Sequence, residues 1–212
     1  MRRYGLAIVA SIVMLATGPA AADPLQDHEC FGKDNMRRIT GCTELLQRPG
    51  LDPMTRSTAF AMRALALSLI GRYVEAIQDY DRAIEIIPDY AVALNNRAWA
   101  KFKLGRIKEA EPDVEASLRL DRTSPHAHDT RAHVRQWQGR AKEALKDYRI
   151  AMRLGGPRMV KLYQCGLQAN GLYLGPLSGI ITESLERALA ECVKTTRCDP
   201  LPPDEECKAA IS

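Results

Sequence analysis

One six-residue phrase occurs three times in this chain at an interval of 34 residues, and this repeat limits the possible folds more than any other feature. The phrase, Gly-Arg-x-x-Glu-Ala, begins at Gly71, Gly105 and Gly139. An Arg-Ala pair lies eight residues before each glycine, and an aspartate lies eight residues after it. Such a chain repeats one supersecondary unit, which cannot bury its apolar face alone and must stack against its neighbours.

Each repeat has the pattern of two antiparallel helices joined at the glycine. Apolar residues recur at three- and four-residue spacing on both sides of it, as on one face of a helix. Glycine suits the end of the first helix, where the backbone often needs a positive φ. Ala64 and Ala76 are small enough for two helices to approach closely. Tyr80 and Tyr148 are large enough to fill the layer between hairpins, and Pro88 closes a second helix.

Residues 57–90, 91–124 and 125–158 resemble tetratricopeptide (TPR) repeats. The first copy keeps the family's small–Gly–Tyr–Ala–aromatic–Ala–Pro pattern at Ala64, Gly71, Tyr73, Ala76, Tyr80, Ala83 and Pro88. The second copy departs at Ser117 and at Pro112, which costs little in the first turn of a helix but ~3 kcal/mol deeper in it. The third lacks an aromatic at Ala141. The resemblance implies an all-α fold, a TPR-type helix-hairpin solenoid.

In TPR arrays the first helix of each hairpin lines a concave groove, so the resemblance also implies a protein or peptide partner. By repeat position, the predicted partner-binding groove contains nine residues: Asn95, Trp99, Phe102, Lys103, His126, Asp129, His133, Gln136 and Trp137. Trp99 and Trp137 are the only tryptophans, and solvated tryptophans beside polar donors are typical of binding surfaces. The alternative is that both pack between hairpins.

The repeated arginines and aspartates share one register. The arginines are Arg63, Arg97 and Arg131, and the aspartates are Asp79, Asp113 and Asp147. Because both charges recur together, we expect one ion pair inside each hairpin. The alternative is that the arginines form a ladder that binds a ligand.

Residues 1–22 have the parts of a cleavable signal peptide: Arg2 and Arg3, an uncharged stretch from Gly5 to Gly18, and Ala20–Ala22. The stretch is shorter than the ~20 residues of a membrane span. We therefore expect a periplasmic or secreted protein without stable membrane insertion after cleavage; the alternative is a retained anchor. Cleavage lowers the formal net charge from +4 to +2, which gives no reason to propose a nucleic acid partner.

Residues 23–56 are predicted to cap the array. An amphipathic helix is expected over 33–47, with Ile39, Cys42, Leu45 and Leu46 on its apolar side. Arg48-Pro49-Gly50 ends it, and terminal positions of solenoids require such caps.

Gly155-Gly156-Pro157 marks the other boundary of the repeats. Beyond it we expect a helix over 160–169 and another over 182–193 with Thr182 as N-cap. Residues 159–194 resemble the small helical peptidoglycan-binding-like domain of envelope proteins, on Leu162, Gln164, Gly171-Leu172-Tyr173, Gly175-Pro176-Leu177, Gly179 and Ala188-Leu189. The family's Asp is Ser178 here, and Thr182 and Leu185 also depart from the pattern. The resemblance implies peptidoglycan as a further candidate partner, with wall-binding-like residues Tyr173, Gly175, Ser178 and Gly179.

Six cysteines lie outside the repeats: Cys30, Cys42, Cys165, Cys192, Cys198 and Cys207. An even number in an exported chain favours disulfides, although sequence alone does not choose among the pairings. In the peptidoglycan-binding-like fold the first and last helices pack together, which implies Cys165–Cys192. Cys30–Cys42 and Cys198–Cys207 are then expected, and the tail, residues 195–212, is a disulfide-closed loop or disordered.

We expect no catalytic, metal or cofactor site. His126, His128, Asp129 and His133 lie close in sequence, but a zinc site needs three or four converging ligands, and His128 projects away from the other two histidines. No strained nucleophile turn occurs. The first hypothesis is a non-catalytic interaction scaffold. A peptidoglycan-binding protein with the repeats as spacer is the alternative, and an accessory enzyme of envelope remodelling is the second alternative.

Overall fold

The computed structural model describes residues 29–201 and residue 207, so the predicted signal peptide and most of the tail lie outside the described residues. The fold is all-α, and no strand occurs between residues 29 and 201. The helices are α2 (Asn35–Gln47), α3 (Pro53–Leu69), α4 (Tyr73–Ile86), α5 (Ala91–Lys103), α6 (Ile107–Leu120), α7 (Pro125–Trp137), α8 (Ala141–Ala169) and α9 (Glu183–Cys192). No helix in this part of the chain is long and apolar enough to cross a membrane.

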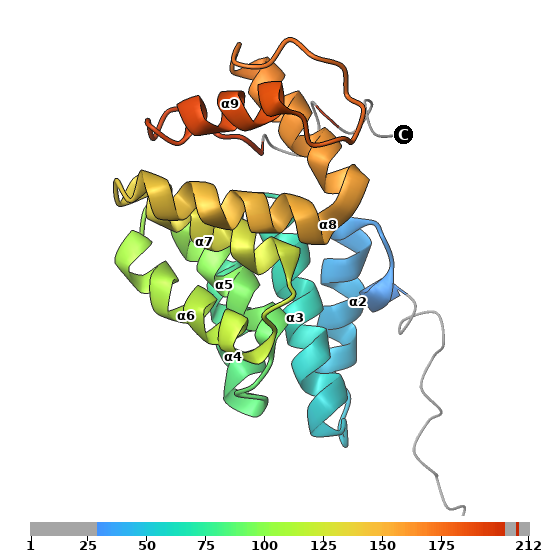
Figure 1. The fold of residues 1–212 in the computed structure, drawn as a ribbon. Coiled ribbons are helices and arrows are strands. Elements are labelled where there is room, and N and C mark those ends of the chain that lie inside the picture. The colour runs from blue at the N-terminus through green and yellow to red at the C-terminus, as the bar shows by residue number, and fades with distance from the viewer. Residues whose placement is uncertain (1–28, 202–206, 208–212) are drawn as a thin grey trace, which may run out of the picture.

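Three helix hairpins stack side by side, as the 34-residue period predicts (Figure 1). They are α3–α4, α5–α6, and α7 with the first part of α8. Each turns at a glycine with positive φ: Gly71 at 79°, Gly105 at 74° and Gly139 at 74°. At the first turn the Arg72 N–H donates to the Leu67 carbonyl over 2.8 Å, which satisfies a carbonyl at the helix end.

The predicted ion pair is present in every hairpin. Arg63, Arg97 and Arg131 each hold their own hairpin's aspartate with two nitrogens, at 2.6–2.9 Å. Two of the arginines also reach the preceding hairpin: Arg97 binds Asp81 at 2.7 Å, and Arg131 binds Glu115 at 3.0 Å. The arginines therefore join successive hairpins as well as the two helices of each, and they leave no ligand ladder.

The second repeat tolerates its two departures from the pattern. Ser117 donates its hydroxyl to the Ala91 carbonyl over 2.8 Å, and the first repeat makes the equivalent contact from the other helix, from Ser57 to the Ala83 carbonyl. Pro112 lies inside α6, one turn beyond the first, and its ring is exposed to solvent. The missing N–H therefore costs α6 a hydrogen bond at its solvent-facing side, where water can satisfy the freed carbonyl.

The N-terminal helix packs against the array as predicted. Asp34 caps α2 by accepting from the Arg37 N–H, and α2 contacts α3. The Cys30–Cys42 disulfide is present, with its Cα atoms 4.4 Å apart. A Cβ at Gly41 would lie 2.7 Å from the Cys30 nitrogen, so glycine is what lets the incoming chain lie against α2.

At the C-terminal end, α8 is interrupted at the predicted boundary. Gly156 has φ 65° and ψ −163°, which is not helical, so α8 consists of two helical segments that meet at a kink there, and the second segment runs on to Ala169. After it, Thr182 caps α9 as predicted, by accepting from the Leu185 N–H. One hydrophobic core cluster extends from Ala132 and Tyr148 of the third hairpin to Leu185 and Cys198, so the third hairpin and the segment that follows share one core.

Two of the three predicted disulfide pairings are wrong. Cys165 pairs with Cys207, and Cys192 pairs with Cys198, with Cα separations of 5.9 and 5.2 Å. The chain turns back immediately after α9, which brings Cys198 under the helix end that carries Cys192. Cys192 is therefore not available to Cys165 on α8.

The disulfide pairing can be checked directly. Non-reducing peptide mapping by mass spectrometry should give crosslinked peptides that join 165 to 207 and 192 to 198. A peptide that joins 165 to 192 would contradict the structure.

The hairpin ion pairs should contribute measurably to stability. Replacing Asp113 with Asn leaves Arg97 and Lys101, both mostly buried, without their shared carboxylate, so unfolding free energy should fall by about 3 kcal/mol. A double-mutant cycle on Arg97 and Asp113 in urea denaturation should give a coupling of at least about 1 kcal/mol. The solvent-exposed pair Arg106–Glu109 is the control, and its coupling should be clearly smaller because water screens both charges. Equal coupling in the two pairs would contradict this role.

Candidate functional site

An aromatic cluster lies where the first helices of two successive hairpins meet. Trp99 of α5 stacks on Phe102 with ring centroids 5.3 Å apart, and the His133 ring of α7 meets both rings edge-on at 5.2 and 5.7 Å. Trp137 adds a further edge contact with Phe102 at 6.2 Å. We call this face, lined by Trp99, Phe102, His133, Gln136 and Trp137, the α5/α7 groove. The aromatic contacts fix these side chains relative to one another.

The groove is partly open to solvent. A cavity of about 220 Å³ is lined by Phe102, Lys103, His133, Gln136, Trp137, Thr196, Cys198 and Asp199. Trp137 has 53% of its surface exposed, whereas Trp99 is half-buried beneath the ammonium of Lys103, which lies 5.4 Å from its ring centroid. The two tryptophans thus differ: Trp99 packs within the cluster, and Trp137 stands at its edge with a free face.

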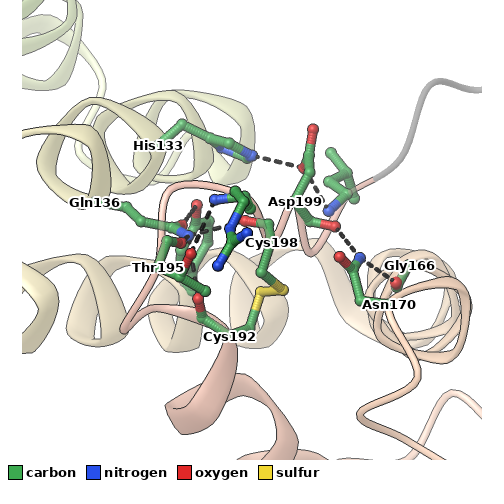
Figure 2. The surroundings of a disulfide bond; sticks show 11 residues. His133, Gln136, Gly166, Asn170, Cys192, Thr195, Cys198 and Asp199 are labelled. Carbon is green, nitrogen blue, oxygen red and sulfur yellow. Dashed lines mark hydrogen bonds and ion pairs between the residues drawn. A yellow bond between two sulfur atoms is a disulfide. The ribbon is translucent and has the colours of Figure 1, made fainter.

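The chain's own C-terminal loop, residues 193–201, forms the opposite wall of this cavity. Figure 2 shows the Gln136 side chain pointing at the backbone of this loop. Its amide nitrogen donates to the carbonyls of Thr195 at 2.6 Å, Cys198 at 2.9 Å and Cys192 at 3.2 Å. Carbonyls only accept, so the Gln136 amide must face them, and its oxygen accepts from the Tyr148 hydroxyl at 2.7 Å.

His133 is held between two oxygen acceptors. Its Nδ1 donates to the Asp129 carbonyl at 2.9 Å, and its Nε2 lies 3.0 Å from the Asp199 carboxylate (Figure 2). Burial opposes the charged ring, but the charges of Asp129 and Asp199 outweigh it and raise the pKa of His133 to about 9. Burial likewise works against the Asp199 carboxylate, yet the bond from His133 holds its pKa below the usual value. The contact is therefore an imidazolium–carboxylate pair at neutral pH.

The predicted groove residues do not all share this surface. Asp129 is buried behind His133, where burial raises its pKa and the Tyr163 hydroxyl donates to it. Asn95 is also buried, with its amide donating to Asn96 at 3.2 Å, and His126 is exposed away from the cavity lining. Trp99, Phe102, Lys103, His133, Gln136 and Trp137 do come together.

Sequence reasoning missed the loop side of the site. Thr196, Cys198 and Asp199 lie in the segment interpreted as a disulfide-closed loop or a disordered tail, outside the repeat register. His133 and Asp199 are 66 positions apart, and no periodic signal links them. Gln136 gave no sequence signal for the loop either, because its burial and its bonds to the loop are seen only in the structure.

The wall-binding-like residues build a loop with few free polar groups. The Tyr173 hydroxyl donates to the Pro176 carbonyl at 3.2 Å, and a Cβ at Gly175 would collide with the Tyr173 ring. Gln164 donates to the Ser178 hydroxyl at 3.2 Å and accepts from the Gly179 N–H at 2.9 Å. These four residues therefore stabilise the loop itself. Beside them a shallow hollow of about 440 Å³ is lined by residues including Leu172, Leu174 and Arg187, and Leu174 is 96% exposed.

His128 and its neighbours do not converge on a metal. His128 lies 3.4 Å from the Asp147 carboxylate and 3.1 Å from the Arg122 carbonyl. Together with Arg131 it keeps the pKa of Asp147 below the usual value, against the effect of burial. Between residues 29 and 201, and at residue 207, no three His, Cys, Asp or Glu side chains form a group that could hold a metal ion.

Comparison with known proteins agrees with this architecture. A family model described as a TPR repeat matches residues 65–105, and one described as a tetratricopeptide repeat matches residues 91–124. The two matches together cover residues 65–124, within the first two of the three repeats that resemble the TPR family in sequence. No curated protein sequence matches the chain.

Solved structures are also similar to parts of this chain. A MamA double mutant, RS-1 ArsTM, has 16% identity and a TM-score of 0.54 over 69% of this chain and 80% of its own. MamA gives 19% identity and a TM-score of 0.49 over 57% and 68%. The first TPR of Spaghetti (RPAP3), bound to the HSP90 peptide SRMEEVD, gives 27% identity and 0.46 over 50% and 84%. The first of these supports the TPR-type solenoid and nothing finer.

The His133 pair should make stability fall in alkaline solution. Because the folded pKa of about 9 lies above the ordinary 6.5, the contribution is complete below pH 6.5 and disappears as the pH rises through about 9. Unfolding free energy from urea titrations should therefore fall by about 3 kcal/mol between pH 6.5 and 10. His133→Gln should remove this part of the slope. An identical pH dependence in the two proteins would contradict an imidazolium at this position.

Proposed function

We propose that the protein is a non-catalytic interaction scaffold that binds a protein or peptide partner in the α5/α7 groove. The observation that carries this proposal is the half-exposed Trp137, fixed against Phe102 at the edge of an open cavity. A rigid tryptophan with one free face offers a partner a large contact area at little cost in conformational entropy. TPR repeats are used for such contacts, in keeping with the family resemblance.

The dimensions of the cavity favour a side chain of a partner over a free small molecule. At about 220 Å³ it is smaller than the ~300–1,000 Å³ usual for small-molecule sites, and its mouth is open. Lys103 places a cation at its rim and Asp199 an anion. A partner segment that inserts one side chain beside Trp137 and crosses this rim fits the site.

The cysteine chemistry supports a location outside the cytoplasm. All six cysteines are paired in disulfides, which form and persist in oxidising compartments. Together with the predicted signal peptide, this supports a periplasmic or secreted protein, docked at the cell envelope through its C-terminal segment.

A second candidate function is peptidoglycan binding, with the repeats as spacer. The hollow of about 440 Å³ beside Leu174 favours it, because it is a concave, accessible surface on the peptidoglycan-binding-like segment. The self-satisfied hydrogen bonds of Tyr173, Ser178 and Gly179 count against it. Sedimentation of the mature protein with purified sacculi tests this candidate, with Leu174→Asp as the variant that should lose binding.

Substitution at the groove edge tests the first function. A photoreactive residue at position 103, which is exposed at the cavity, should capture the partner in cells. The captured protein should then bind the purified chain with at least 30-fold lower affinity after Trp137→Ala, about 2 kcal/mol. Melting of this variant should be unchanged, since Trp137 is half exposed.

The control is Leu120→Ala on α6, which removes a similarly exposed apolar side chain, 45% against 53%, away from the groove. It should leave affinity unchanged. Equal loss in both variants, or unaltered binding in Trp137→Ala, would refute the groove as the binding site.

A further inference from the structure

The inner half of the α5/α7 groove already has an occupant. The C-terminal loop lies over His133 and Gln136 and contributes Cys198 and Asp199 to the cavity wall (Figure 2). Cys198 and Pro200 are buried there and Thr196 lines the cavity, whereas the side chains of Lys194 and Arg197 are exposed to solvent. One side of the loop thus faces the groove and the other faces solvent, as a bound peptide segment would.

The hydrogen bonds between the groove and the loop all have their donor on the groove side. The groove supplies donors, the Gln136 amide and the His133 imidazolium. The loop supplies acceptors, the carbonyls of Thr195 and Cys198 and the Asp199 carboxylate, and Cys192 at the end of α9 supplies a third carbonyl. If the loop left, both buried donors would need new acceptors from water or from a partner chain. The donors are therefore suited to any segment that brings carbonyls and a carboxylate, and the loop is the segment that reaches them first.

The loop is held by its connections as much as by its contacts. The Cys192–Cys198 disulfide closes it onto the end of α9, and Cys165–Cys207 ties the chain beyond it to α8. Asn170 adds a bond to the Asp199 carbonyl at 2.8 Å. A tethered segment binds at a high effective concentration, so it excludes a free competitor even where its own contacts are few.

We propose that the C-terminal loop is a tethered occupant of the α5/α7 groove that masks His133 and Gln136 from a partner. This inference rests on the proposed function and adds its regulation: the partner first meets Trp137 and Lys103 at the open edge, and reaches the inner donors only when the loop is displaced. The apparent affinity of the protein for its partner is accordingly the affinity of the open groove multiplied by the fraction of molecules in which the loop is displaced.

The test uses the loop as its own probe. A fluorescent synthetic peptide of residues 190–201, oxidised between 192 and 198, is titrated into the full mature chain. In the opened variant, Cys192→Ser with Cys198→Ser and Asp199→Ala, the loop loses its disulfide closure and its bond to His133, so the peptide should bind at least tenfold more tightly than to the wild type. Arg197→Ala, an exposed change in the same loop, is the control and should behave as the wild type.

Acrylamide quenching gives a second readout, since both tryptophans of the chain lie in the groove. Quenching should rise in the opened variant and not in Arg197→Ala. If circular dichroism finds the opened variant unfolded, Asp199→Asn alone replaces it, and it should raise both peptide affinity and quenching. Equal peptide affinity and equal quenching in a folded variant and the wild type would overturn the proposal.

This outcome is separable from the fate of the proposed function. Peptide binding to the opened variant needs no external partner, so it supports masking even if position 103 captures nothing in cells. A partner that binds the wild type and the opened variant with equal affinity would support the groove as a site and overturn its masking.

Discussion

The ion pair inside each hairpin is the interaction on which the remaining architecture depends. A carboxylate on the second helix of every hairpin is largely buried, and such a group is tolerated only when a cation meets it with good geometry. Arg97 and Arg131 meet that need with two nitrogens each and use a third for the hairpin before. The same side chains thus fix the spacing within and between hairpins, which sets α5 beside α7 and brings their aromatic residues into contact.

The parts of the fold that follow the period could be predicted, because a repeat reports on local geometry. Gly71, the Arg–Asp pairs and the Thr182 cap each depend on residues close in sequence or at a fixed offset. The disulfide partners of Cys165 and Cys192 depend instead on where the chain turns after α9, and no fixed sequence offset encodes that turn. The Gly156 kink was visible as a break in the pattern, but whether a glycine–proline pair ends a helix or bends it depends on what packs beyond it.

The candidate site likewise has a part that repeat position could predict and a part that it could not. Repeat position was enough to select Trp99, Phe102, His133 and Trp137, because the first helix of each hairpin occupies an equivalent place. It misplaced Asp129, which turns inward to Tyr163, and it gave no indication of Asp199. Gln136 connects the repeats to the loop: its oxygen accepts a hydrogen bond from Tyr148 in the third hairpin, and its nitrogen donates to the loop. Binding in the groove and packing of the third hairpin consequently share one amide group.

The direct link between the two segments of α8 has a mechanical consequence. The first segment completes the last hairpin, and the second carries Cys165 and is followed at once by Asn170; both residues anchor the C-terminal loop. An α-helix turns by ~100° per residue, so one residue inserted between Ala141 and Gly155 would rotate everything beyond it by more than a quarter turn. The loop would then be aimed away from α7, although no residue of either had changed. The number of residues in the first segment of α8 therefore determines the direction in which the C-terminal loop faces relative to the solenoid.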